Sequence, residues 1–260
     1  DLDSNKLLKS VSTGAAQDSA IDTKGGRYFA SVSAPPRMAI VDSDKLEMTG
    51  EVPLPGPADL LAFNSDNGMV YVCNDDEPEI WVIDPQAKKI ISTIKLPGKG
   101  MEDLAFEPSH KLLYQVMKEA NAVAVIDVAG NKVLNTWPTG PATSPHGMAL
   151  VPDTDFMLVA GGGGKLALLN RTSGKIVASA DIAPKVDEMT YDPGLHRAYC
   201  ASGTGKISIV GLEDGKLATL GEAPGAAGCH SIVVDPKTHT VWIAFSKGDQ
   251  SFAQPFTAEK

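Results

Sequence analysis

Apolar and polar positions along this chain follow a pattern that recurs about every forty residues, in six units. Within each unit, short stretches such as Ser231–Val234 alternate apolar and polar side chains. Turns rich in Asp, Pro, Gly and Lys, such as Asp235-Pro236-Lys237, separate these stretches. Alternation with a period of two residues indicates half-buried β-strands. A repeat of this length is typical of supersecondary units that stack or are arranged radially.

The pattern within each unit predicts four short strands. The second strands are expected at Val70–Cys73, Leu113–Val116, Met157–Ala160, Ala198–Ala201 and Val241–Phe245, and the third at Met38–Val41, Ile80–Ile83, Val123–Ile126, Leu166–Leu169 and Ile207–Val210. A more polar fourth strand follows, as at Ile90–Ile94. Four strands per unit with regular turns are typical of a propeller blade. The sequence therefore predicts an all-β fold, a β-propeller of six four-stranded blades, in which residues 1–260 form a single domain.

The two ends of the chain predict how the propeller closes. The sixth unit supplies strands near Ser231–Val234, Val241–Phe245 and Ser251–Phe256 but lacks a fourth strand. Residues Leu7–Ser12, ahead of the first unit, have the pattern of that missing strand. An N-terminal strand that completes the last blade would remove both sheet edges, which otherwise invite aggregation.

One position of the repeat is polar or ionisable in every unit and lies at the start of the first strand. This column reads Gln17, Asp59, Glu102, His146, Asp187, His230. In a radial array the first strand of each blade lines the central channel, so we expect the six side chains to converge on one mouth of that channel. The next column adds Asp18, Asp103 and Glu188, whose carboxylates would repel one another unless a cation or a proton joins them. Alternatively, they point into turns and meet solvent.

The column predicts a candidate site for a divalent metal ion. His146, Asp187 and His230 come from three successive units, and two imidazoles with one carboxylate suit Zn, Cu, Fe, Mn or Ni. Calcium is a further candidate because the column is rich in carboxylates. Glu102 would be a fourth ligand, would orient a histidine, or would act as a general base. The alternative interpretation is a solvated rim whose polar residues cap turns or bind water.

Several stretches resemble a known repeat family. They are Met69-Val70-Tyr71-Val72-Cys73-Asn74, Ile80-Trp81-Val82-Ile83-Asp84, Ala124-Val125-Ile126-Asp127 and Ser231-Ile232-Val233-Val234-Asp235-Pro236-Lys237-Thr238. They are similar to the YVTN-type propeller repeats, and most of all to the YncE-like group of periplasmic and secreted proteins. The resemblance implies export and the binding of a ligand or partner, and it carries over no catalytic residue. Such proteins usually have seven blades, whereas six units are counted here.

Charge and composition exclude some classes of function. The net charge is −9 without a basic cluster, so nucleic acid is a poor partner. No apolar run reaches the roughly 18 residues of a membrane-spanning helix. The chain begins at Asp1 rather than Met, as expected of a processed or trimmed product. Nucleotide-binding and catalytic motifs such as G-x-S-x-G or H-E-x-x-H do not occur.

The three cysteines leave alternatives open. Cys200 and Cys229 lie on adjacent units and would form a disulfide in an exported protein. Cys229 would otherwise act as a soft metal ligand beside His230, and Cys73 is expected to be a small buried side chain.

Three hypotheses of function follow. The first is an exported propeller that binds a metal ion, a small ligand or a protein. The second is a metal-dependent hydrolase, lactonase or lyase that uses the channel-mouth ion as a Lewis acid. The third is a protein-interaction scaffold without a metal, which binds through loops such as Asn74–Glu79.

Overall fold

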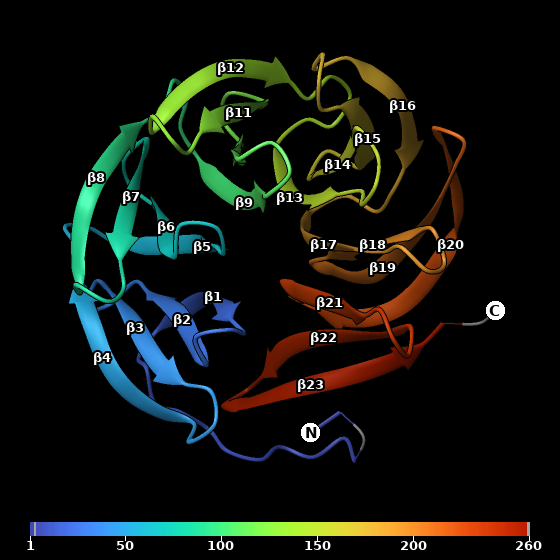
Figure 1. Cartoon of the computed structure of the whole chain (residues 1–260). Coiled ribbons are helices and arrows are strands. Elements are labelled where there is room, and N and C mark those ends of the chain that lie inside the picture. The colour runs from blue at the N-terminus through green and yellow to red at the C-terminus, as the bar shows by residue number, and fades with distance from the viewer. Residues whose placement is uncertain (3, 259–260) are drawn as a thin grey trace. The chain divides into compact units, whose positions relative to one another are not determined.

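A computed structural model describes residues 1–2 and 4–258 of the chain. Over these residues the strands form six antiparallel sheets and no helix is present. The described part of the chain accordingly offers no helix that is long and apolar enough to cross a membrane. The fold class predicted from the sequence, an all-β propeller with six blades, is confirmed (Figure 1).

Each blade follows the predicted order of short strands. The first three blades comprise β1 (Ala16–Asp22), β2 (Arg27–Val32), β3 (Arg37–Asp42), β4 (Glu47–Pro53), β5 (Ala58–Asn64), β6 (Met69–Asn74), β7 (Glu79–Asp84), β8 (Lys89–Lys95), β9 (Met101–Glu107), β10 (Leu112–Met117), β11 (Ala122–Asp127) and β12 (Lys132–Pro138). The last three comprise β13 (Pro145–Leu150), β14 (Phe156–Gly161), β15 (Lys165–Asn170), β16 (Ile176–Asp181), β17 (Val186–Asp192), β18 (Arg197–Ser202), β19 (Thr204–Glu213), β20 (Lys216–Ala227), β21 (Ser231–Asp235), β22 (Thr240–Lys247) and β23 (Gln250–Thr257).

The chain divides into two compact units, and each is described by itself. Unit 1 comprises residues 1–113 and 126–134, and unit 2 comprises residues 114–125 and 135–260. Unit 1 contains blades one and two, unit 2 contains blades four to six, and the residues of blade three are divided between them. That residues 1–260 form a single domain stays a prediction.

Within each unit, the first strands of successive blades are neighbours. In unit 1, β1 contacts β5 and β5 contacts β9; in unit 2, β13 contacts β17 and β17 contacts β21. The strands of a sheet follow one another in chain order, so each first strand pairs with its second strand on one side only. Residues at equivalent positions of neighbouring first strands are therefore brought close together.

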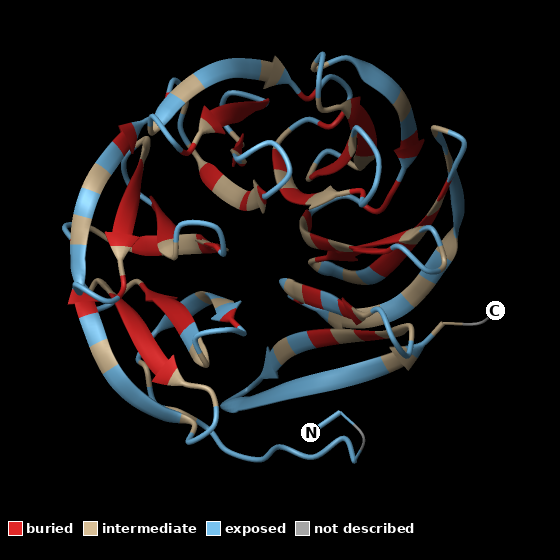
Figure 2. Cartoon of the chain, viewed as in Figure 1, coloured by how far each residue is buried: buried red, intermediate tan, exposed pale blue. Residues whose placement is uncertain are grey.

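Burial follows the position of a strand in its blade (Figure 2). In blades one to five the second and third strands are mostly buried, whereas the fourth strands, such as β4 and β8, are largely exposed. In blade six the third strand, β23, is exposed. Neighbouring blades share their cores. Phe29 and Met38 of blade one pack in one cluster with Val72 and Trp81 of blade two. Each such fully buried side chain stabilises the fold by about 1.5–3 kcal/mol.

The sixth sheet differs from the predicted closure. It has three strands, β21, β22 and β23, and residues Leu7–Ser12 form no strand in the structure. Leu7 and Leu8 are exposed. The Lys9 ammonium instead donates to the Lys45 carbonyl at 3.1 Å and pairs with Glu47 at 3.4 Å, at the start of β4. These side-chain contacts hold the segment to the turn of blade one, without the backbone ladder that a strand requires.

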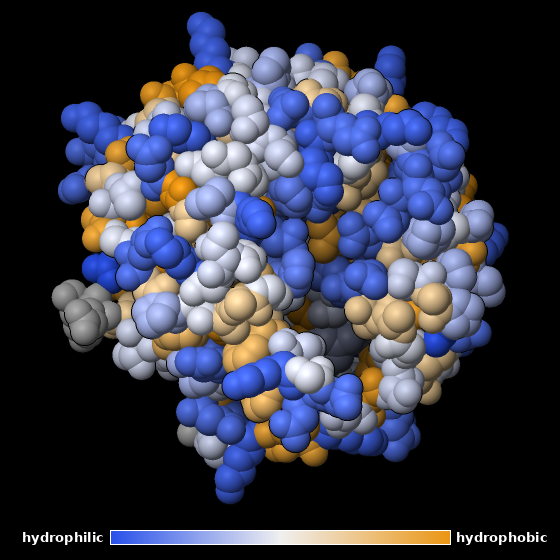
Figure 3. All heavy atoms as spheres, turned by 180° about the vertical axis from the view of Figure 1, so that it is seen from behind, coloured by the Kyte–Doolittle hydropathy of each residue, from blue (hydrophilic) through white to orange (hydrophobic). Residues whose placement is uncertain are grey.

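One face of the molecule is predominantly polar. On the face seen in Figure 3, hydrophilic residues are spread widely and hydrophobic residues form small, separate patches. Single apolar residues scattered among polar ones are common on protein surfaces and do not by themselves mark a site. The polar column at the starts of the first strands is therefore the candidate site.

Candidate functional site

The polar column of the repeat occupies an irregular part of the first strands. In blades one, two, four and five the pairing register shifts there, as in a β-bulge. The bulged pairs are Gln17–Asp18, Asp59–Leu60, His146–Gly147 and Asp187–Glu188. Glu102 is the second residue of β9, and His230 directly precedes β21. Bulges re-aim side chains and are frequent beside active sites.

In unit 2, a chain of backbone hydrogen bonds connects the starts of blades four, five and six. Gly162 N donates to Ser144 O at 2.8 Å, and Lys185 N donates to Gly162 O at 2.8 Å. Gly203 N donates to Lys185 O at 2.9 Å, and Gly228 N donates to Gly203 O at 3.0 Å. The segments before His146, Asp187 and His230 are thus held by one continuous set of main-chain contacts.

A left-handed residue stands two positions before the column residue in blades three to six. These residues are Gly100 (φ 70°), Ser144 (φ 49°), Lys185 (φ 60°) and Gly228 (φ 72°). The equivalent residues in blades one and two, Ala15 and Pro57, do not have a positive φ. A positive φ is uncommon for residues other than glycine. The positive φ therefore distinguishes blades three to six, which carry Glu102, His146, Asp187 and His230, from blades one and two.

His230 and Asp187 form a direct pair. His230 Nδ1 and Asp187 Oδ2 lie 2.5 Å apart, and the two side chains are 70% and 33% exposed. A ring nitrogen of His146 and a carboxylate oxygen of Asp187 lie within 4.8 Å of one another. Asp187 therefore approaches one imidazole from each neighbouring blade, but His230 is not part of the group of ligand atoms within 4.8 Å of one another that includes His146 and Asp187.

The tautomer of His146 is determined by its backbone contact. His146 Nδ1 lies 2.7 Å from Ser144 O. Because a carbonyl oxygen only accepts, Nδ1 carries the proton and Nε2 carries the lone pair. Histidines that ligate metals commonly donate their second nitrogen in this way. The arrangement thus leaves Nε2 as the ligand atom of His146.

The glycine run Gly161–Gly164 supports this segment. A side chain at Gly161 would come within 2.5 Å of Thr143 O, and one at Gly162 would meet His146 Cε1 at 3.4 Å. The first approach is too close for any Cβ atom. The signal in the sequence for this support is a glycine run in the same repeat unit as His146.

The remaining column residues belong to unit 1. Gln17 Nε2 donates to Ser33 Oγ at 2.9 Å, within its own blade. The pKa of Cys73 is raised well above its usual value, first by burial and then by the carboxylates of Asp59, Asp18 and Glu102. These three carboxylates therefore lie near one another in unit 1. That all six column residues converge on one site stays a prediction.

The second column connects neighbouring blades. Asp18 Oδ2 accepts a hydrogen bond from Leu61 N at 3.0 Å, and Glu188 Oε2 accepts one from Ile232 N at 3.2 Å. Both amides lie on the first strand of the next blade. These carboxylates thus accept hydrogen bonds from main-chain amides of the next blade. This role differs from both expectations for the second column, which were a bound cation and exposure in a turn. The signal in the sequence is an alternation between acidic and non-acidic residues: Asp18, Leu60, Asp103, Gly147, Glu188, Ser231.

All three cysteines are free thiols, so the predicted disulfide between Cys200 and Cys229 is not formed. The Cys229 thiol donates to the carbonyls of Ser231 and Ala244 at 3.5 and 3.7 Å. Burial raises its pKa, and burial raises the pKa of Cys200 to about 12. A protonated thiol bonded to carbonyls is a poor metal ligand, because the thiolate is the ligating form.

Comparisons with known proteins support the fold. No model of a known protein family matches the chain. The chain is similar to the seven-bladed beta-propeller protein Rv1057 of Mycobacterium tuberculosis, with 26% identity over 134 residues, which cover 49% of this chain and 33% of that protein. The match therefore spans about a third of the curated relative.

Two solved structures resemble the chain. One is the hydrazine synthase of Kuenenia stuttgartiensis, with a TM-score of 0.76, 19% identity, and coverage of 92% of this chain and 76% of that chain. The other is a chain of a mitotic checkpoint complex, with a TM-score of 0.81, 14% identity, and coverage of 94% and 75%. At these identities the likeness shows the fold alone: a β-propeller, here with six blades.

Proposed function

We propose that this chain is an exported β-propeller of the YVTN-type, YncE-like group, and that it binds a divalent metal ion, or a small ligand through that ion, with His146, Asp187 and His230. The observation that carries the proposal is the approach of two imidazoles to one carboxylate across blades four to six. Export and membership of this group rest on the repeat motifs, and the similarity to a curated propeller supports them only at the level of the fold.

The donor set favours a borderline transition metal. The three side chains offer nitrogen and oxygen atoms, and burial raises the pKa of the Cys229 thiol, which disfavours the ligating thiolate form. Imidazole with carboxylate suits Zn, Mn, Fe or Cu. Three protein ligands would leave a coordination position open for water or a ligand. Because a ligating imidazole must be neutral, protons compete with the metal ion for such a site.

Elemental analysis tests the proposal directly. Purified protein is incubated with Zn²⁺, dialysed and analysed for bound metal, beside the double variant His146→Ala/His230→Ala. A matched control, His110→Ala/His196→Ala, removes the same number of imidazoles from turns elsewhere in the chain. The wild type and the control are expected to retain about one ion per chain, and the site variant to lose it. Equal retention by all three proteins, or no retention by the wild type, would refute the site.

A second candidate function uses the same residues. A carboxylate that holds a histidine by one ring nitrogen is also the arrangement of an oriented general base. The protein would then be a metal-dependent hydrolase, lactonase or lyase. Metal-dependent turnover of a panel of esters and lactones, lost in Asp187→Asn, separates this candidate from binding alone.

The scaffold hypothesis has a narrower basis. In the loop Asn74–Glu79, Asn74 Nδ2 donates to Glu79 Oε1 at 3.3 Å, and Trp81 Nε1 donates to the same oxygen at 3.0 Å. The ends of the loop are thus engaged internally, and its exposed tip is acidic: Asp75, Asp76 and Glu77. A partner at this loop would have to be basic.

A further inference from the structure

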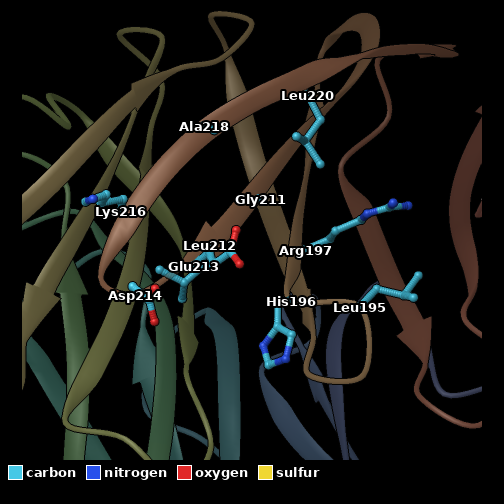
Figure 4. Close-up of a pocket in the computed structure, with 10 residues that line it drawn as sticks. All are labelled: Leu195, His196, Arg197, Gly211, Leu212, Glu213, Asp214, Lys216, Ala218 and Leu220. Carbon is cyan, nitrogen blue, oxygen red and sulfur yellow. The ribbon is translucent and has the colours of Figure 1, made fainter. Parts of the chain in front are cut away.

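Polar side chains gather at two places of unit 2 outside the column. One is a hollow of about 730 Å³ at the outer strands of blade five (Figure 4). The Leu220 side chain lies over Gly211 there, 3.4 Å from the place that a Cβ atom of this glycine would take. Arg197 is engaged by the Tyr199 hydroxyl. The other place, the turn ahead of β13, holds a connected set of hydrogen bonds that leads to His146.

The Asn121 side chain reaches from blade three to blade four. Asn121 directly precedes β11, and its Oδ1 accepts a hydrogen bond from Ser144 N at 2.7 Å. Ser144 O accepts from Gly162 N at 2.8 Å and from His146 Nδ1 at 2.7 Å. These residues all belong to unit 2. The amide and the carbonyl of Ser144 thus connect the Asn121 side chain to the His146 ring.

Ser144 has a backbone conformation that needs support. Its φ is 49°, in the left-handed region that residues other than glycine rarely adopt. The φ and ψ angles of a residue decide how its amide is turned relative to its carbonyl. Asn121 holds the amide and Gly162 holds the carbonyl, so the two bonds together keep Ser144 in this conformation. The carbonyl is thereby kept in place to accept from His146 Nδ1.

The main chain of the repeat gives no reason for an asparagine at this position. In four blades, the residue directly ahead of the third strand accepts, through its carbonyl, from the amide that follows the fourth strand. These four residues are Pro36, Pro78, Asn121 and Gly164. Proline and glycine perform this role without a polar side chain. The side-chain amide of Asn121 is therefore not required for it, and its described contact is the one with Ser144.

We propose that Asn121 is a positioning residue of the metal site. Through Ser144 it holds His146 in the tautomer that carries the proton on Nδ1, which leaves the Nε2 lone pair for an ion. The effect on metal binding rests on the proposed function, whereas the effect on the tautomer is measurable without metal. Contacts behind a ligating histidine commonly change the affinity for metal by about 10–100-fold when they are removed.

Nitrogen-15 NMR of the histidine rings in metal-free protein tests the effect on the tautomer. The spectra are recorded at about pH 8.5, where an ordinary imidazole is neutral, and His146→Ala identifies the His146 signals. Asn121→Gly removes the acceptor and, like Gly164, tolerates a left-handed conformation. Asn121→Asp retains an acceptor oxygen. The control Asn131→Gly makes the same exchange in another turn, at a φ of 50°.

The wild type, Asn121→Asp and Asn131→Gly are expected to show His146 with its proton on Nδ1. Asn121→Gly is expected to shift the ring toward the form with the proton on Nε2. In titration calorimetry with Zn²⁺, the affinity is expected to fall about 10–100-fold in Asn121→Gly and to stay unchanged in the other two variants. Thermal unfolding shows that each variant is folded. If Asn121→Gly does not fold, Asn121→Ala, which also lacks the acceptor, takes its place.

The outcomes separate this inference from the proposed function. The inference is overturned by a wild type with the proton on Nε2, or by an unchanged tautomer in Asn121→Gly. An undiminished Zn²⁺ affinity of Asn121→Gly beside a wild type that binds Zn²⁺ also overturns it, as does an equal loss in Asn131→Gly. If the wild type binds no Zn²⁺ while the tautomer shifts in Asn121→Gly, the proposed function fails and the positioning of His146 by Asn121 stands.

Discussion

The hydrogen bond from Leu61 N to Asp18 predicts a measurable contribution of the second column to stability. Leu61 is 4% exposed and its amide donates to Asp18 Oδ2 at 3.0 Å, across the boundary between blades one and two. Asp18→Ala removes the acceptor and leaves a buried amide without a partner. Asp18→Asn retains an acceptor oxygen at the same place and removes the charge. Comparing the two variants therefore isolates the hydrogen bond from the cost of burying a carboxylate.

The magnitude follows from the state of the amide. A buried donor without a partner costs about 1–3 kcal/mol, so Asp18→Ala is expected to be less stable than Asp18→Asn by that amount. For a chain of this size, each kcal/mol corresponds to roughly 2–4 °C in Tm. The exposed neighbour Gln17 is the matched control, and Gln17→Ala is expected to change stability by less than about 0.5 kcal/mol.

The pH dependence gives a second readout. Burial raises the pKa of Asp18 above its usual 3.8, although hydrogen bonds from Leu61 and Ser19 lower it. The folded protein therefore binds this proton more tightly than the unfolded chain does. Wild type should gain stability relative to Asp18→Asn as the pH falls through the folded pKa toward 3.8. Urea unfolding between pH 7 and 4 measures both effects. Equal stabilities of Asp18→Ala and Asp18→Asn at pH 7 would refute the reasoning.

Three further predictions follow from other contacts. Arg27→Gln breaks the 2.7 Å ion pair with the buried Asp22 and should cost about 1–3 kcal/mol at pH 7. Burial opposes ionisation of Asp22, but the hydrogen bond and charge of Arg27 lower the pKa of Asp22 overall. The stability that the ion pair contributes is therefore present above pH 3.8 and is lost as the pH falls through the folded pKa. A difference in urea unfolding between wild type and Arg27→Gln that does not change with pH would contradict this prediction. Gly147→Ala places a Cβ 2.7 Å from Met189 N and should destabilise by about 1–3 kcal/mol in thermal unfolding, whereas an unchanged Tm would show that the strands separate freely. The pKa of Cys200 is raised to about 12, and all three cysteines are buried and free. Native protein should therefore react slowly with a maleimide at pH 7.5, and unfolded protein should react fully. A disulfide found by mass spectrometry in freshly purified protein would contradict this prediction.

The fold could be predicted from the sequence because its signals are local. Alternation within strands such as Val70–Cys73, and turn residues such as Asp235-Pro236-Lys237, decide each strand over a few residues. The repeat then provides the same local signals in each of the six units. Closure could not be predicted in the same way. Whether Leu7–Ser12 forms a strand depends on a partner distant in the chain, and its alternating pattern alone does not create a ladder.

The positions of the candidate site residues could be predicted from the repeat, but the contacts between their side chains could not. The repeat places His146, Asp187 and His230 at equivalent positions, and in the structure Asp187 approaches both histidines. The bond between Asp187 and His230, and the tautomer of His146, depend on side-chain orientations that alignment of the repeat does not contain.

The construction of the first strand explains why the column carries such different residues. Each first strand has a ladder on one side only, and in blades one and five the second bulge residue, Asp18 or Glu188, accepts from an amide of the next blade. The joining of blades is thus performed by the second position. The first position joins blades only in part: His230 bonds to Asp187 across blades five and six, whereas Gln17 bonds within its own blade. Exchange of both histidines therefore removes these contacts and the His146 bond to Ser144 O together with the proposed ion ligands. The stability of His146→Ala/His230→Ala has to be measured without metal, so that lost metal binding can be told apart from lost structure.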